Sequence, residues 1–261
     1  MKDKLKKILL FYQIYKKLTR PSLKLNENGG VVITFDDKSI SDWNSTHEVL
    51  LKYNWKATFC VSEIDTLSSE EIEKLKDFQE YGHEISGHGY NHVDAVKYVK
   101  KHGIDSYLDS EVLPMIESMK QKSLTVKSFA YPYGKHSKKI DASLLKYFNI
   151  VRATSYGRIP PSLHTCYFNY SSMVQGIGID SIYKHMDEKY LMKLLSYAKE
   201  KKKILILYGH RTSKDNLNGY NVNPSVLETI SKYIIDHNMK FYTLSDLHNL
   251  RVNHLKQREN A

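Results

Sequence analysis

Residues 31–37, VVITFDD, decide the fold of this chain. The run 31–35 is rich in β-branched and aromatic side chains and predicts a buried strand, and two adjacent carboxylates, Asp36 and Asp37, follow it. Neighbouring side chains of an extended chain point to opposite sides, so the two carboxylates cannot do the same job. In a parallel barrel, the C-terminal end of such a strand is where an active site should lie. The alternative is a polar turn in which Asp37 caps the next helix.

Beyond that strand, strand-like and helix-like runs alternate along the chain. This alternation predicts a parallel sheet with helices outside it, in one α/β domain at residues 28–250, followed by a polar tail at 251–261. The stretch 157–185 is poorly periodic and is predicted to be rich in loops. The expected strands are 31–35, 56–61, 83–86, 128–131, 150–153, 204–207 and 240–243; the expected helices are 44–53, 70–80 after the cap-like Ser68-Ser69, 105–121, 139–147, 187–202, one started by Asn223-Pro224 and one capped by Ser245.

Length and composition limit the classes of protein to consider. The 261 residues suffice for one large domain or two small ones, and no linker divides them. The net charge of +10 suggests acidic partners such as nucleic acid, an anionic lipid surface or an anionic glycan, but the abundance of Lys fits a general bias equally well. No nucleic-acid-binding motif is recognised, so no nucleic acid partner is expected. With only Cys60 and Cys166 present, a cysteine metal site is excluded and a structural disulfide is not expected.

The N-terminal segment is basic and amphipathic. Within residues 1–20, apolar side chains repeat at helical spacing and are flanked by Lys, and we place a helix and a linker at residues 1–27. The apolar run is too short to span a bilayer, and no small-residue cleavage site follows it. Such a helix either lies on an anionic membrane or packs on the domain. The expected location is therefore cytoplasmic, or peripheral at the cytoplasmic face of a membrane.

A pair of histidines follows the third expected strand. His88 and His92 have the H-x3-H spacing that brings two imidazoles onto one side of a helical turn, close enough to share a metal ion. Asp37 stands at the equivalent end of the first strand, so a set of two histidines and one carboxylate becomes available. Such a set leaves coordination positions open for water and substrate. The alternative is two surface histidines in a loop.

These motifs together resemble a known family. The segments TFDD (34–37), GHEISGHGYNH (82–92) and YPYG (131–134) are similar to the first three motifs of the polysaccharide deacetylase family, also called the chitooligosaccharide deacetylase or NodB homology domain. The segment ILYGH (206–210) resembles its last motif, in which a strand ends in a histidine. The resemblance covers roughly residues 28–250, and the combination of motifs is more specific than any one of them.

The resemblance implies a fold and a reaction. The fold would be a distorted (β/α) barrel of about seven units, with parallel strands inside and helices outside. The protein would be a metal-dependent hydrolase that removes an N-acyl group, above all N-acetyl, from an amino sugar in a polysaccharide, oligosaccharide or lipid-linked glycan. A deformylase or amidase acting on a non-polymeric substrate and a weakly active glycan-binding domain are the alternatives. Besides this glycan, an anionic membrane surface that residues 1–20 would bind is the other expected partner.

The resemblance also implies a role for each motif residue. Asp37, His88 and His92 would hold one divalent metal ion, usually zinc. Such an ion can lower the pKa of water to about 7 and can polarise an acyl carbonyl. The other implied roles are general base for Asp36, general acid for His210, an oxyanion-binding backbone N–H for Tyr133 and a place in the acyl pocket for Tyr208.

The sequence departs from the family pattern at several positions. Ala130 stands where the family carries an arginine that holds the base, so we expect another cation near Asp36 and consider Arg152 first. The fourth motif is not recognisable, and Asp180 is a weak candidate for orienting His210, with a position at the surface favoured. Tyr208 replaces the leucine that usually lines the acyl pocket. These departures leave the acyl group and the sugar open.

Overall fold

The computed structural model describes residues 28–214 and 219–259. The predicted helix and linker at residues 1–27 lie outside these ranges, so the proposed membrane contact of residues 1–20 stays a prediction. Within the described residues, no helix combines the length and the apolar character that crossing a membrane requires.

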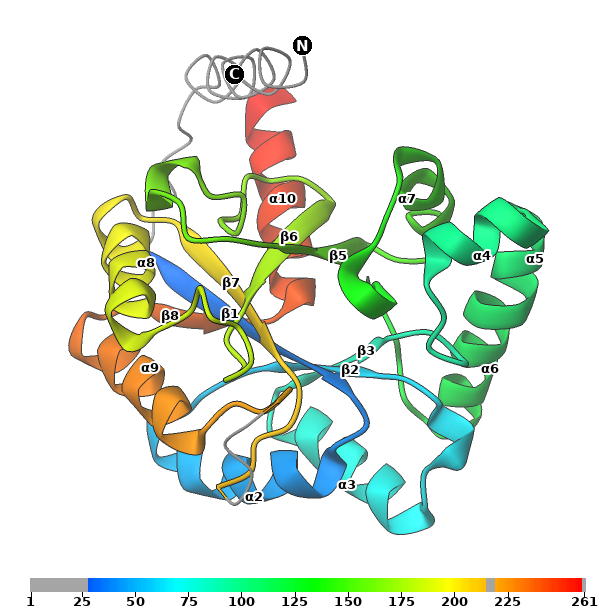
Figure 1. Ribbon diagram of the computed structural model, residues 1–261, viewed down its shortest axis with the longest axis horizontal. Helices are drawn as coiled ribbons and strands as arrows, with labels where there is room; N and C mark the ends of the chain where they lie inside the picture. Colours follow the sequence, from blue (N-terminus) through cyan, green and yellow to red (C-terminus); the bar gives the residue numbers. More distant parts are fainter. Residues whose placement is uncertain (1–27, 215–218, 260–261) are drawn as a thin grey trace.

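Parallel strands form the centre of the molecule, and helices cover their outer face (Figure 1). In the described part of the chain the sheet order is β2-β3-β4-β5-β6-β7-β1-β8, and a further pairing of β1 with β2 closes the first seven strands into a barrel. The predicted distorted (β/α) barrel of about seven units is confirmed. The strands are β1 (Gly30–Asp37), β2 (Thr58–Val61), β3 (Glu84–Gly87), β4 (Ser128–Ala130), β5 (Ile150–Ser155), β6 (Met173–Gly178), β7 (Ile204–Gly209) and β8 (Lys240–Tyr242).

The barrel is regular at the C-terminal ends of its strands and distorted at the other end. β1 pairs with β8 along Gly30–Val32 and with β2 only along Thr34–Asp37, so β8 occupies part of the edge that would otherwise face β2. At the same end of the barrel, the segment that contains Phe168 lies between β6 and β7. The backbone N–H of Phe168 donates to the carbonyl of Ile204, at the start of β7, at 2.9 Å. Both distortions leave the strand ends that carry the motif residues close together.

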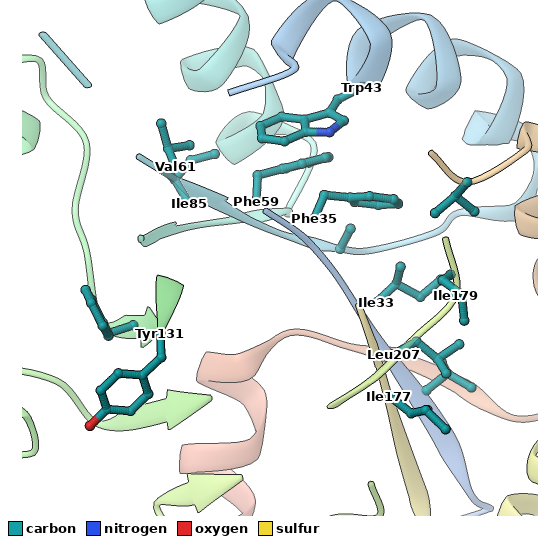
Figure 2. Close-up of a cluster of buried hydrophobic side chains, with 14 of the residues drawn as sticks. Ile33, Phe35, Trp43, Phe59, Val61, Ile85, Tyr131, Ile177, Ile179 and Leu207 are labelled. Atoms are coloured by element: carbon teal, nitrogen blue, oxygen red, sulfur yellow. The ribbon is translucent and has the colours of Figure 1, made fainter. Parts of the chain in front are cut away.

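Alternating side chains separate two apolar clusters. Val31, Ile33 and Phe35 of β1 belong to the larger cluster, which lies between the barrel and its helices. There the ring of Phe35 stacks on Phe59 with centroids 5.7 Å apart. Figure 2 shows both residues within this cluster. Val32 belongs to the second cluster, on the opposite face of the strands. The even-numbered positions of β1 therefore point into the barrel, and Asp36 is the last of them.

The helices connect the strands and follow the predicted order. Most expected boundaries hold within a few residues, and the helix predicted after Asn223-Pro224 begins there, with Asn223 as its N-cap. Ser68 and Glu71 form a capping box at the start of α3. The helices are α2 (Ile40–Leu50), α3 (Ser69–Glu80), α4 (Ala95–His102), α5 (Ile104–Tyr107), α6 (Leu113–Gln121), α7 (Lys138–Leu144), α8 (Glu188–Glu200), α9 (Pro224–Asp236) and α10 (Leu244–Glu259).

The structure differs from the sequence prediction at several places. Helix α4 (Ala95–His102) was not among the expected helices. The helix predicted at 105–121 is interrupted by η3 (Leu108–Val112), a turn of π-helix between α5 and α6. Thr243, and not Ser245, caps α10, because its side chain accepts from the N–H of Asp246 at 3.2 Å. Ser245 instead binds Glu84. Helix α10 also continues to Glu259, through part of the segment expected to be a polar tail.

Strand β6 lies inside the stretch that was predicted to be loops. Its inward positions Gly176 and Gly178 carry no side chain, so the apolar periodicity that reveals a strand is missing there. At Gly178 the space is needed by a neighbouring side chain. A Cβ at Gly176 would lie 3.4 Å from side-chain atoms of both Arg152 and Tyr208, and one at Gly178 would overlap the ring of Tyr183.

Candidate active site

Three side chains converge at the C-terminal ends of β1 and β3. Asp37 Oδ1 lies 3.2 Å from His92 Nε2 and 3.6 Å from His88 Nε2. Asp37 has left the strand conformation, with φ of 82°, and His92 is also left-handed, with φ of 56°. These turns bring both side chains to the buried ring of His88. Sequence reasoning grouped these three residues, and the structure brings them together.

The tautomer of His88 is determined by its second ring nitrogen. His88 Nδ1 lies 2.9 Å from the carbonyl oxygen of Ala130, which can only accept a hydrogen bond, so Nδ1 carries the proton. Nε2 is then the ring nitrogen left free to bind a metal ion. Burial would raise the pKa of Asp37, but the neighbouring imidazoles of His88 and His92 outweigh it and hold that pKa well below its usual range. Asp37 is therefore a carboxylate at neutral pH.

These three residues fit a divalent metal ion. One potential ligand atom from each of Asp37, His88 and His92 lies within 4.8 Å of the others. A carboxylate oxygen and two imidazole nitrogens suit zinc and leave coordination positions free. The Ala130 carbonyl supplies the outer hydrogen bond that usually orients a metal-binding histidine.

Asp36 points into the barrel and forms a buried ion pair with Arg152. Asp36 is 3% exposed and Arg152 is fully buried, and Arg152 Nη2 donates to Asp36 Oδ1. Burial would raise the pKa of Asp36, but the charge of Arg152, with smaller contributions from His88 and His210, lowers it. The expected cation near Asp36 is thus Arg152. It lies on β5 opposite Ala130 of β4, the position where the resemblance would place an arginine.

His210 follows β7 and is fixed by Asp180. Its Nδ1 lies 2.8 Å from Asp180 Oδ2, its backbone N–H donates to Asp180 Oδ1 at 3.0 Å, and its carbonyl accepts from Trp43 Nε1 at 2.7 Å. Burial would lower the pKa of His210, but Asp180 and the nearby carboxylate of Asp36 raise it. The surface position favoured for Asp180 was wrong. Asp180 is only 1% exposed. It follows β6, which pairs with β7, the strand that His210 follows.

Tyr208 lies in the barrel interior between Arg152 and His210. The Arg152 guanidinium is 5.1 Å from the centroid of the Tyr208 ring, and the edge of that ring faces His210 at 6.0 Å. The hydroxyl of Tyr208 donates to the Tyr183 hydroxyl at 3.0 Å. Tyr208 is thus a buried neighbour of the candidate site.

Two exposed tyrosine rings flank the site. The turn at residues 132–134 puts Tyr133 in a left-handed conformation, with φ of 59°, and the Tyr133 ring lies 4.9 Å from the His92 ring. Tyr220 lies 4.9 Å from His210, and its carbonyl accepts from the backbone N–H of Arg211 at 3.2 Å. Tyr220 was not predicted as a site residue, because its contact with His210 is visible only in the tertiary structure.

The fold and the site together define a parallel barrel with a candidate metal centre at the C-terminal ends of its strands. Residues 25–149 match the family model described as polysaccharide deacetylase. This match confirms the family resemblance that the motifs indicated. No curated protein matches the sequence.

Solved structures with the same fold are similar over most of the chain. The carbohydrate esterase family 4 domain of a xylanase from the hindgut metagenome of Trinervitermes trinervoides is 18% identical, with a TM-score of 0.58, over 87% of this chain and 92% of that one. A peptidoglycan deacetylase from Bacillus subtilis is 16% identical, with a TM-score of 0.55, over 89% and 94%. A family 4 carbohydrate esterase from Streptomyces lividans, solved with acetate, is 16% identical, with a TM-score of 0.53, over 81% and 91%.

Proposed function

We propose that this protein is a metal-dependent hydrolase that removes the N-acetyl group from an amino sugar of a glycan. The observation that carries this proposal is the arrangement around Asp37, His88 and His92. Beside these candidate ligands lie a carboxylate held by a buried arginine and a histidine held by a buried aspartate. A metal site with a base and an acid is what hydrolysis of an amide requires. The family match and the names of the structural neighbours support the same reaction class.

Asp37, His88 and His92 would hold the metal, which we propose to be zinc. When bound there, it would supply an activated water and a Lewis acid for the acyl carbonyl. The protein prepares this site before binding: Asp37 is ionised, and His88 already presents Nε2.

Asp36 would accept the proton from the attacking water. Its lowered pKa keeps it ionised at neutral pH, and the ion pair with Arg152 fixes the orientation of its carboxylate. Because Asp36 and Asp37 leave the chain in different directions, one can take the proton while the other binds the ion. General-base catalysis of this kind contributes roughly 10² to 10⁴-fold.

His210 would donate a proton to the departing amine. Its Nδ1 is bound to Asp180, so Nε2 is the nitrogen that is left for the substrate. The carboxylates around it raise its pKa, and this favours the protonated form that a general acid needs. The backbone N–H of Tyr133 would complete the site by binding the oxyanion of the tetrahedral intermediate.

The substrate would contact the tyrosines around the site. Tyr133 and Tyr220 are 59% and 55% exposed, and exposed aromatic rings of this kind suit the apolar faces of sugars. Tyr208 would lie against the acyl group. Because a tyrosine is larger and more polar than the usual leucine, it favours a small acyl group, and this observation supports a deformylase as the second candidate function.

Mass spectrometry of amino-sugar glycans before and after incubation with the zinc-loaded protein tests both candidates. Loss of acetyl supports the deacetylase and loss of formyl supports the deformylase. Asp36→Asn is the matched control, because it should keep stoichiometric metal and lose most of the turnover. A loaded wild-type protein that leaves every N-acylated glycan and lipid-linked sugar intact would contradict the proposal and favour a glycan-binding domain.

A further inference from the structure

The loop that carries His88 and His92 is held by one buried carboxylate, Glu111. Glu111 Oε2 accepts from the backbone N–H of Asn91 at 2.9 Å, and Oε1 accepts from Asn91 Nδ2 at 2.7 Å. Its backbone carbonyl accepts from the N–H of Tyr90 at 3.1 Å. The two residues that immediately precede His92 are therefore both bound to this single residue.

The local backbone explains why such support is needed. Gly89 and His92 are both left-handed, with φ of 85° and 56°. A non-glycine residue rarely adopts this conformation, so the surrounding contacts have to hold His92 in it. The N–H of Asn91 lies between these two left-handed residues. Its hydrogen bond to Glu111 holds the backbone just before His92, and so holds the His92 ring near Asp37. Without that bond, the stretch from Gly89 can relax and move His92 Nε2.

Glu111 reaches the loop because the helix that carries it is irregular. It lies in η3, the π-helical turn at Leu108–Val112, just before α6 begins with Pro114 near its first position. Proline donates no backbone hydrogen bond, so a regular α-helix cannot pass through this point unbroken. π-helical turns of this kind occur frequently at functional sites. Glu111 is 2% exposed, and its two oxygens bind Asn91 rather than a cation of the described residues. Burying a carboxylate in this way is unfavourable unless its hydrogen bonds are satisfied.

We infer that Glu111 is a positioning residue for the metal site, which sets the place of His92 through Asn91. This inference rests on the proposed metal site at Asp37, His88 and His92. Glu111 would not touch metal or substrate. Its contribution would be to hold the ligand loop in the binding geometry before the ion arrives, and outer partners of metal ligands typically contribute 10- to 100-fold in affinity.

The test exchanges the polarity of the Glu111–Asn91 contact. Glu111→Gln places an amide N–H₂ against one of the two donors of Asn91, and Asn91→Asp places two carboxylates in contact, so each single variant breaks the pair. In the double variant Asn91→Asp with Glu111→Gln, the amide introduced at position 111 can make both hydrogen bonds again. Its oxygen accepts from the backbone N–H of residue 91, and its nitrogen donates to the carboxylate introduced there. Each apo protein is titrated with Co²⁺, whose visible spectrum reports ligand number and geometry.

We expect each single variant to bind Co²⁺ about 10- to 100-fold more weakly with a changed spectrum, and the double variant to recover most of both. Glu84→Gln is the matched control. Glu84 also accepts hydrogen bonds, from Ser128 and Ser245, at the other end of β3, so its substitution should lower the melting temperature without changing the Co²⁺ spectrum. A wild-type affinity and spectrum in Glu111→Gln, or a double variant no better than the single ones, would overturn this inference alone. A wild-type protein that binds no Co²⁺ would overturn the metal site and this inference together.

Discussion

Arg152 donates a buried hydrogen bond to Asp36 from the strand next to the one where the family resemblance places that arginine. Ala130 and Arg152 are partners in the register of β4 and β5, so their side chains leave the sheet on the same face. The chain thus places a cation beside Asp36 from a different strand.

Removing this cation should change the pH dependence of activity. In Arg152→Met, the charge of Arg152 no longer opposes the effect of burial on Asp36, so the pKa of Asp36 should rise. Because a general base must be ionised, the acid limb of kcat/KM should then move to higher pH, and the rate at neutral pH should fall by about 10²-fold. A pH profile measured on the zinc-loaded variant checks this.

Moving the arginine provides the control for that experiment. The double variant Ala130→Arg with Arg152→Ala returns the guanidinium to the neighbouring strand and should restore the acid limb toward that of the wild type. An unchanged acid limb in Arg152→Met would mean that another group takes the proton. The melting temperature should be followed as well, because an unpaired buried carboxylate destabilises the fold.

The alkaline limb should depend on Asp180. Asp180→Asn removes the negative charge that raises the pKa of His210, so that pKa should fall and the protonated acid should be lost at lower pH. The alkaline limb of kcat should therefore move toward neutrality, with a loss of rate on the order of 10-fold or more at the wild-type optimum. His210→Ala should remove this transition altogether. If the limb stays in place in Asp180→Asn, His210 is not the group that titrates.

Loss of one metal ligand should separate binding from folding. His92→Ala should lose zinc and activity together and keep the circular dichroism spectrum of the wild type, because His92 lies in a loop outside the core clusters. A chelator should inactivate the wild-type protein, and added zinc should restore it. Metal content measured by atomic emission checks both statements, and full zinc occupancy in His92→Ala would contradict the assignment.

Acyl preference should change at Tyr208. Tyr208→Leu enlarges the space beside His210 and removes the hydroxyl bound to Tyr183, so we expect a shift toward acetyl over formyl substrates. Tyr208→Phe keeps the ring and loses only that hydroxyl, which separates size from polarity. Competition between acetylated and formylated amino sugars measures the ratio. The same ratio in Tyr208→Leu would show that Tyr208 does not contact the acyl group.

Acid should destabilise the metal-free fold through His83. Burial, with smaller contributions from the nearby His47 and Lys56, lowers the pKa of His83 to about 3, whereas an unfolded histidine titrates near 6.5. Between about pH 6.5 and pH 3, the unfolded state therefore binds one more proton at His83 than the folded state does. As the pH falls through this range, His83 lowers the free energy of unfolding by about 1.4 kcal/mol per pH unit.

The Ala57–His83–His47 hydrogen bonds are consistent with neutral rings, since His83 Nδ1 accepts from the backbone of Ala57 at 3.0 Å and Nε2 lies 2.9 Å from His47 Nδ1. His83→Gln should show a smaller pH slope in denaturant titrations of the apo protein. Equal slopes in the two proteins would contradict the assignment to His83.

Sequence alone determined the parts of this protein that are encoded over short distances. The β-branched and aromatic run at residues 31–35 and the two carboxylates that follow it are read from one short stretch, and His88 and His92 are close along the chain. Periodicity and motif spacing report local geometry directly, because side-chain direction in a strand or a turn depends on the residue's place in that element. These signals were sufficient for the barrel class and for the candidate metal ligands.

Tertiary structure decided what holds those residues in place. Asp36 and Arg152 are 116 residues apart, and Asp180 and His210 are 30 apart, so neither partnership follows from local spacing. Strand β6 escaped detection because its inward glycines make room for the side chains of other strands and loops. Which cation meets which carboxylate depends on strand register and barrel closure, and these are set by packing across the whole domain rather than by any one segment.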